Sequence, residues 1–103
     1  MGTFKQTYQG ATIEVICEGS RCTVRRIEDG QSDPTWTNGL SVAFFAGERG
    51  SNFYDNPIFD LAQGIVFLHV TAVGGTGHEP WEEAWSAISL VDGSVLSYRN
   101  EGG

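Results

Sequence analysis

Three β-type runs separated by two turn dipeptides fill residues 4–26, FKQTYQGATIEVICEGSRCTVRR, and this stretch decides the fold. The dipeptides Gln9-Gly10 and Gly19-Ser20 are typical of two-residue hairpin loops. The runs on either side alternate between apolar and polar residues, as half-buried strands do. The N-terminal quarter of the chain is therefore predicted to be a three-stranded antiparallel meander.

The two turns also fix which residues face each other. With two-residue loops, Val15 in the middle run pairs with Phe4 on one side and with Val24 on the other. The face that results contains Phe4, Tyr8, Ile13, Val15, Cys17, Cys22 and Val24. The opposite face carries a row of alternating charge, namely Lys5, Glu14 and Arg25, which stabilises cross-strand pairing. A shift of one residue would destroy both patterns, so we expect this register to be well specified.

The same register places Cys17 opposite Cys22, beside the second turn. The pair can form a cross-strand disulfide if it is oxidised. In a reducing cytoplasm we expect two thiols packed in the core instead. Two cysteines are too few for a zinc site, and their spacing is not that of a redox motif.

Length and composition restrict the class of protein. The chain has 103 residues, which we interpret as one domain spanning residues 1–103. The net charge of −7 excludes the usual kind of direct nucleic-acid binder. No apolar run is long enough to cross a membrane, and the first residues do not resemble a signal peptide, so we expect a cytoplasmic protein.

The negative charge lies in the later part of the sequence. Residues 29–103 carry Arg49 and Arg99 against ten carboxylates, a balance of 2 − 10 = −8. Such an excess promotes solubility, and it also suits an acidic face that meets a basic partner.

Beyond the meander, the pattern is mixed. Residues 29–39 are rich in Gly, Pro, Asp, Ser and Asn and predict a loop. A short strand is expected within residues 40–46. Asn56-Pro57 resembles a helix start and Gly64 a helix end, which predicts a two-turn helix between them. Residues 65–73 form a nearly continuous apolar run, typical of a central strand covered on both faces.

Residues 80–93 allow two interpretations. Trp81, Ala84, Trp85, Ile88 and Val91 form one stripe of a helix, which we favour. Alternatively, Asp92-Gly93 is the turn of a hairpin that joins residues 88–91 to 94–98. The mixed polarity of the paired faces counts against the hairpin. Residues 94–99 form a final strand in either case, and residues 100–103 should fray.

The predicted fold class is therefore α+β. We expect an antiparallel sheet of five or six strands, with the N-terminal meander at one edge and the strand of residues 65–73 at its centre. One or two short helices would pack on this sheet.

Candidate catalytic and metal-ligating residues are few. His69 lies within an apolar strand, where a histidine is usually structural. His78 is followed by Glu79, Glu82 and Glu83, but Pro80 makes a shared metal site awkward. No nucleophile elbow, phosphate loop or zinc-protease motif is present. We therefore predict no catalytic residues, no metal, no cofactor and no enzymatic activity.

The sequence favours a small acidic protein-binding module that inhibits or regulates a partner protein with a basic surface. In size and charge it is similar to phage-encoded inhibitors of bacterial defence systems. The alternatives are an assembly subunit of a multiprotein complex or virion, which a self-associating apolar edge would favour, and a small metal-dependent enzyme. Loops and aromatic residues near carboxylates make residues 29–60 the expected binding region. The candidate partner-binding residues are Asp29, Asp33, Trp36, Glu48, Tyr54, Asp55 and Asp60.

Overall fold

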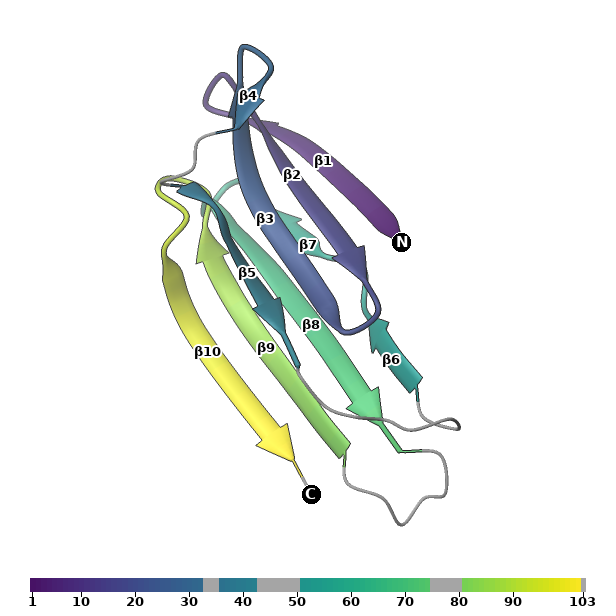
Figure 1. Cartoon of the computed structure of the whole chain (residues 1–103). Coiled ribbons are helices and arrows are strands. Elements are labelled where there is room, and N and C mark those ends of the chain that lie inside the picture. Colours follow the sequence, from purple (N-terminus) through teal and green to yellow (C-terminus); the bar gives the residue numbers. More distant parts are fainter. Residues whose placement is uncertain (33–35, 43–50, 75–80, 103) are drawn as a thin grey trace.

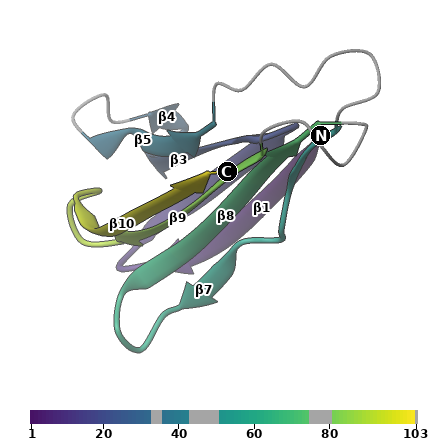
Figure 2. The same ribbon diagram turned by 90° about the horizontal axis from the view of Figure 1, so that it is seen from below.

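The chain forms two antiparallel sheets that pack face to face (Figures 1 and 2). The computed structural model describes residues 1–32, 36–42, 51–74 and 81–102. Sheet A consists of β1 (Gly2–Tyr8), β2 (Ala11–Glu18), β3 (Arg21–Glu28), β4 (Gln31–Ser32) and β5 (Asn38–Ser41). Sheet B consists of β6 (Ser51–Tyr54), β7 (Ile58–Asp60), β8 (Ile65–Val73), β9 (Trp81–Ser89) and β10 (Val95–Gly102). This is a two-layer β-sandwich architecture.

Each sheet is a meander of neighbouring strands. In sheet A the order is β1-β2-β3, and β4 and β5 both pair with β3, at different positions along it. In sheet B the order is β10-β9-β8, and β6 and β7 likewise share β8. All of these pairings are antiparallel, so no long crossover is needed inside either sheet.

The predicted register of the N-terminal meander is confirmed. Phe4 pairs with Val15, Val15 with Val24, and Cys17 with Cys22. The first turn has a positive φ at both Gln9 (48°) and Gly10 (79°), the conformation that a two-residue type I′ hairpin requires.

The expected row of charges is also present. Glu14 lies between its two cationic neighbours, 2.6 Å from Arg25 Nη2 and 3.6 Å from Lys5 Nζ. The Glu14 side chain is buried, so this pairing satisfies a carboxylate that would otherwise be costly to remove from water.

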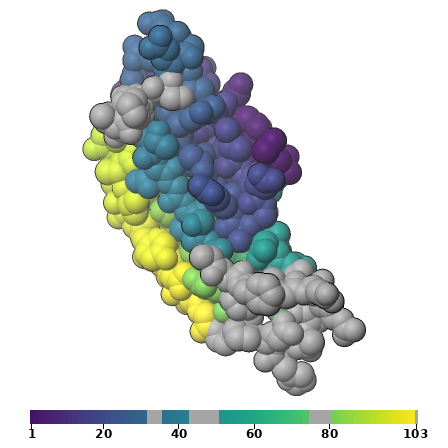
Figure 3. All heavy atoms as spheres, in the orientation of Figure 1, coloured from purple at the N-terminus to yellow at the C-terminus, as the bar shows by residue number. Residues whose placement is uncertain are grey.

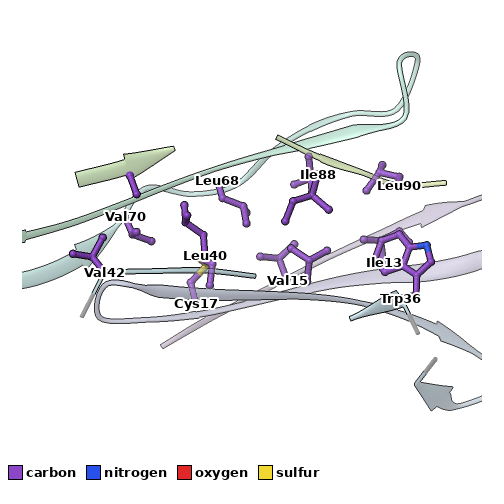
Figure 4. Packing of buried hydrophobic residues seen from close by; sticks show 14 of the residues in the cluster. Ile13, Val15, Cys17, Trp36, Leu40, Val42, Leu68, Val70, Ile88 and Leu90 are labelled. Carbon is purple, nitrogen blue, oxygen red and sulfur yellow. A yellow bond between two sulfur atoms is a disulfide. The ribbon is translucent and has the colours of Figure 1, made fainter. Parts of the chain in front are cut away.

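The core lies between the sheets, where side chains from both layers interdigitate (Figure 4). Sheet A contributes alternate residues of β2 and β3, such as Ile13, Val15 and Val24. Sheet B contributes alternate residues of β8 and β9, such as Val70 and Ile88. These side chains are completely buried, so their removal from water is the main stabilising contribution.

The prediction of an α+β fold is wrong, because the described residues contain no α-helix. Residues 58–60, expected in a helix, form β7, and a turn over residues 61–64 leads into β8. Asn56-Pro57 introduces a strand here, since the apolar residues that follow pair with β8. The central strand is confirmed, because residues 65–73 are β8 and have neighbours on both sides.

The second expected helix is also wrong, and the rival hairpin interpretation is the better one. Residues 81–89 form β9, which pairs with β8 on one side and β10 on the other. Ala84 and Ile88 point into the core, whereas Trp81 and Trp85 lie on the opposite face. The tail predicted to fray belongs to β10 as far as Gly102.

Candidate functional site

The outer face of sheet B, which points away from sheet A, is unusually apolar for a solvent-facing surface. Side chains alternate along β8, so Val66, Leu68 and Val70 are buried, whereas Phe67 and His69 lie outside. The outer face comprises Ile65, Phe67, His69, Thr71 and Val73 of β8 and Trp81, Glu83, Trp85, Ala87 and Ser89 of β9, with Ser97, Arg99 and Glu101 of β10 on one side and Ser51 and Phe53 of β6 and Ile58 and Asp60 of β7 on the other. The sequence predicted cover on both faces of this strand. Within the described residues, Phe67 remains 43% exposed.

Three side chains form a stack across three strands at the centre of this face. The register sets His69 of β8 opposite Trp85 of β9, and Trp85 opposite Arg99 of β10. The rings of His69 and Trp85 are parallel, with an interplanar angle of 5° and centroids 4.7 Å apart. The Arg99 guanidinium carbon lies 4.6 Å from the centroid of the Trp85 ring, a cation–π contact.

Two carboxylates bind the imidazole of His69. Its Nε2 is 2.9 Å from Glu83 Oε2, and its Nδ1 is hydrogen-bonded to Asp55 Oδ2. The segment that carries Asp55 is fixed by a backbone hydrogen bond of 3.0 Å from Asp55 N to His69 O. Partial burial lowers the pKa of His69, but the hydrogen bonds to Glu83 and Asp55, together with their negative charges, outweigh it and raise the pKa above 6.5.

This arrangement suits a protonated His69 with a structural role better than a His69 that acts as a catalytic base. Each ring nitrogen of His69 already faces a carboxylate, and an imidazolium donates from both nitrogens. A general base or a metal ligand needs a free nitrogen lone pair. In residues 1–32, 36–42, 51–74 and 81–102, no cluster of three or more His, Cys, Asp or Glu side chains is arranged to hold a metal ion. His78 lies outside the described residues.

Two shallow hollows border the stack. The first, of about 230 Å³, is lined by Asp55, Asn56, Ile58, Phe67, Leu68, His69 and Trp85. The second, of about 340 Å³, is lined by Phe67, Leu68, Trp85, Ser86, Ala87, Ser97, Tyr98 and Arg99. The first volume is below the range of about 300–1,000 Å³ for small-molecule sites, and the second is near its lower end.

The hollows differ in charge. Asp55 stands at the rim of the first with its side chain 63% exposed, so its carboxylate remains accessible beside His69. Arg99 stands at the rim of the second and is paired with Glu101 at 2.6 Å. Phe67 and Trp85 line both hollows, so an apolar centre lies between an acidic rim and a partly neutralised basic rim.

The structure separates the residues that the sequence grouped into one binding region. Trp36 is 4% exposed and belongs to the core between the sheets. Tyr54 is partly buried and contacts Phe4 edge-on, with centroids 6.3 Å apart. Asp29 lies in the exposed turn between β3 and β4.

The remaining candidates have varied surroundings. Asp60 accepts hydrogen bonds from Gln63 within the turn that follows β7. Of the five predicted binding residues that the structure describes, Asp55 is the one that contacts the His69–Trp85–Arg99 stack directly. Asp33 and Glu48 lie outside the described residues.

The main members of the site, Phe67, His69, Trp85 and Arg99, were not among the predicted binding residues. One signal for them was present in the sequence. Trp81, Glu83 and Trp85 alternate with residues that a strand would bury, and the helix interpretation concealed this pattern.

No protein-family model matches this sequence, and comparisons with curated proteins and with solved structures give no match either. Among the described residues, none belongs to a helix of the length and hydrophobicity needed to span a membrane.

Proposed function

We propose that this chain is a small acidic protein-binding module that inhibits or regulates a partner protein with a basic surface, and that it binds this partner through the outer face of sheet B. The observation that supports the proposal most is the exposure of Phe67 at the centre of a regular sheet face, where it shares two hollows with the half-buried Trp85. Exposed apolar patches on small proteins commonly mark interaction sites. Aromatic residues with an adjacent arginine are typical of interface hot spots.

The charge of this face favours a cationic partner. The register places Asp60, Glu83 and Glu101 on it, and Asp55 adjoins it, against Arg99 and a histidine that is already bound by two carboxylates. An arginine or lysine of the partner would meet Asp55 at the rim of the first hollow, while apolar groups would cover Phe67. Complementary charge would mainly speed association, and aromatic contacts would mainly slow dissociation.

The proposed surface, the outer face of sheet B, differs from the binding region that the sequence predicted within residues 29–60. Asp55 and Asp60 remain on or beside it, whereas Phe67 and Trp85 take the anchoring role first assigned to Trp36 and Tyr54. The role of a phage-encoded inhibitor is supported by size and charge only.

A cytoplasmic location is part of the same proposal, and the cysteines provide its test. Cys17 and Cys22 are joined as a disulfide, with Cα atoms 4.1 Å apart. Disulfides persist mainly in oxidising compartments. Cells are quenched in acid and the protein is then alkylated under denaturing conditions, because both cysteines are buried in the folded chain. Mass spectrometry will show two modified thiols if the protein is cytoplasmic and none if it matures in an oxidising compartment.

The binding proposal can be tested with a displayed library of random linear peptides selected on the immobilised protein. We expect selected peptides to contain Arg or Lys next to apolar residues, and their affinity to fall as salt increases. The Phe67→Ser variant should raise Kd about 30-fold, the effect of losing one hot-spot side chain. The Asp55→Asn variant should weaken binding and reduce its dependence on salt.

Val91→Ser is the matched control, because Val91 is an exposed apolar residue in the β9–β10 turn, outside the outer face. Circular dichroism and thermal melts establish that each variant folds. Binders that tolerate both Phe67→Ser and Asp55→Asn would contradict the proposed surface.

A further inference from the structure

Strand β10 is a long, unprotected edge of sheet B. It pairs with β9 on one side, and no other described strand pairs with its second side. All eight of its residues are exposed. Figure 3 shows β10, in yellow, running uncovered along one side of the molecule. An edge of this kind presents unpaired backbone N–H and C=O groups to any strand that can reach it.

The side chains of β10 are also unusual for a free edge. Val95, Leu96 and Tyr98 are 47%, 54% and 60% exposed. The register sets Tyr98 beside Ser86 and Val95 beside Ile88, both of which face the core. Sheet A covers β8 and β9 through β5, so the apolar side chains of β10 extend beyond the sandwich.

The other edges of the described sheets are protected or short. Strand β1 carries Lys5 at its centre with the side chain 59% exposed, and an edge lysine opposes strand addition. Strands β4, β5, β6 and β7 contain two to four residues each. Strand β10 has eight residues and no lysine. It is therefore the edge best suited to pairing with another chain.

We propose that β10 pairs with β10 of a second copy of this chain, antiparallel about a two-fold axis through Asn100. In this register Arg99 lies opposite Glu101 of the second copy, and Glu101 lies opposite its Arg99. Tyr98 lies opposite Gly102, where no side chain obstructs it. The paired residues, 98–102, follow the irregularity between Val95 and Ser97, so the ladder is regular there.

The charges of β10 favour a second copy of this chain as its partner, and they favour this register. The chain carries a net charge of −7, which opposes most contacts between copies. Strand β10 is locally neutral, because Arg99 and Glu101 balance and already pair at 2.6 Å within one chain. Two copies would bring four alternating charges together, and opposite charges side by side stabilise a strand pair. A shift of each strand by one residue would instead place Arg99 against Arg99.

The dimer would leave the outer face of sheet B free. Arg99 and Glu101 lie on the same face of the strand, so the two-fold axis is perpendicular to the sheet and both outer faces point the same way. The second copy would extend sheet B within its own plane. The dimer would then present two copies of the proposed binding surface side by side.

Sedimentation velocity across a concentration series tests the interface. We expect a monomer–dimer equilibrium for the wild type. Arg99→Glu and Glu101→Arg should each weaken dimerisation about tenfold, because each sets like charges opposite one another. The double variant Arg99→Glu/Glu101→Arg should restore dimerisation.

Glu28→Arg is the matched control. Glu28 pairs with Arg26 at 2.8 Å, two residues away on the same strand, as Glu101 pairs with Arg99. Glu28→Arg changes the net charge by the same amount as Glu101→Arg. Glu28 lies outside the proposed interface, so dimerisation should persist in this variant. Asn100→Cys provides a second readout, since cysteines on the two-fold axis should form an intermolecular disulfide on oxidation, whereas Ser97→Cys should not.

A monomer at every concentration, with no covalent dimer from Asn100→Cys, would overturn the proposal. Dimerisation that is indifferent to both charge reversals would place the interface elsewhere and would equally overturn it. Peptide binding through Phe67 and Asp55 is measured separately, so failure of the dimer and failure of the proposed function are distinguishable.

Discussion

Reduction of the Cys17–Cys22 disulfide should lower the free energy of unfolding by about 2 kcal/mol. The bond joins residues separated by 5 in sequence, and closing so short a loop removes little entropy from the unfolded chain, which gives this modest value. The loss is still a substantial part of the total of about 5–15 kcal/mol expected for a small domain. The hairpin itself should survive, because turn and core contacts also hold β2 against β3.

Urea unfolding with and without a phosphine reductant measures this effect through tryptophan fluorescence. With a slope typical of small proteins, the midpoint should fall by about 1–2 M on reduction. Both cysteines are at most 1% exposed, so the reductant should act only on unfolded molecules. In native buffer, reduction should therefore be slow and should accelerate with urea.

Coincident midpoints for the oxidised and reduced protein would refute the argument from loop closure. Rapid reduction in native buffer would refute the argument from burial. A Cys17→Ala/Cys22→Ala variant provides the control, since it removes the bond irrespective of the reductant. It should be less stable than the reduced wild type, because it also leaves a cavity in the core.

Three further predictions test the core and the site. Trp36→Ala should lower the free energy of unfolding by about 3–5 kcal/mol in a denaturant titration, as for any large core residue, whereas Trp36→Phe should lower it far less. Loss of binding with an unchanged denaturation midpoint would show instead that Trp36 is a contact residue. Val15→Asp should abolish the folded near-ultraviolet spectrum, because it places an unpaired charge at a fully buried position, and a native spectrum would contradict the core assignment. The wild type should be more stable than His69→Gln at low pH, because Glu83 and Asp55 raise the pKa of His69. This difference in stability should be complete below about pH 6.5 and should decline as the pH rises through the folded-state pKa of His69. Melts at a series of pH values check this, and an advantage that grows with pH would contradict it.

The meander of residues 2–28 was predictable because two independent local signals agree there. Turn dipeptides set the loop lengths, and a period of two then sorts apolar from charged side chains. One register satisfies both conditions, and the structure has that register. The central strand, residues 65–73, was predictable from its nearly continuous apolar run, in which most residues are β-branched or aromatic.

The second half was misread because its periodicity is ambiguous. Trp81 and Trp85, like Ala84 and Ile88, are four residues apart, a spacing that places side chains on one side of either a helix or a strand. The expected polar face was also missing. Since the outer face of sheet B carries aromatic residues, the strand alternation separated two apolar sets rather than an apolar set from a polar one.

The site was hidden for a different reason. His69 is 14 residues from Asp55 and 14 from Glu83, and these three residues meet only through the pairing of β8 with its neighbours. That pairing depends on how sheet B is assembled, which the sequence pattern did not determine. The acidic character of residues 29–103 was visible, but Asp55, the one carboxylate among the described candidates that joins the stack, could not be distinguished from the others.

Every strand of sheet A precedes every strand of sheet B in the chain, and every described strand pairing lies within one sheet. The disulfide also lies within sheet A. The two sheets are therefore separate hydrogen-bonded ladders joined by a single connection between residues 42 and 51, and otherwise held together mainly by the core, with a hydrogen bond of 2.9 Å from Asn38 Nδ2 to Gly93 O beside it. A chain divided at that connection would give two fragments, each with a full ladder and one bare apolar face. Reassembly of two such fragments would bury those faces against each other, so the fold has the layout of a fragment-complementation pair.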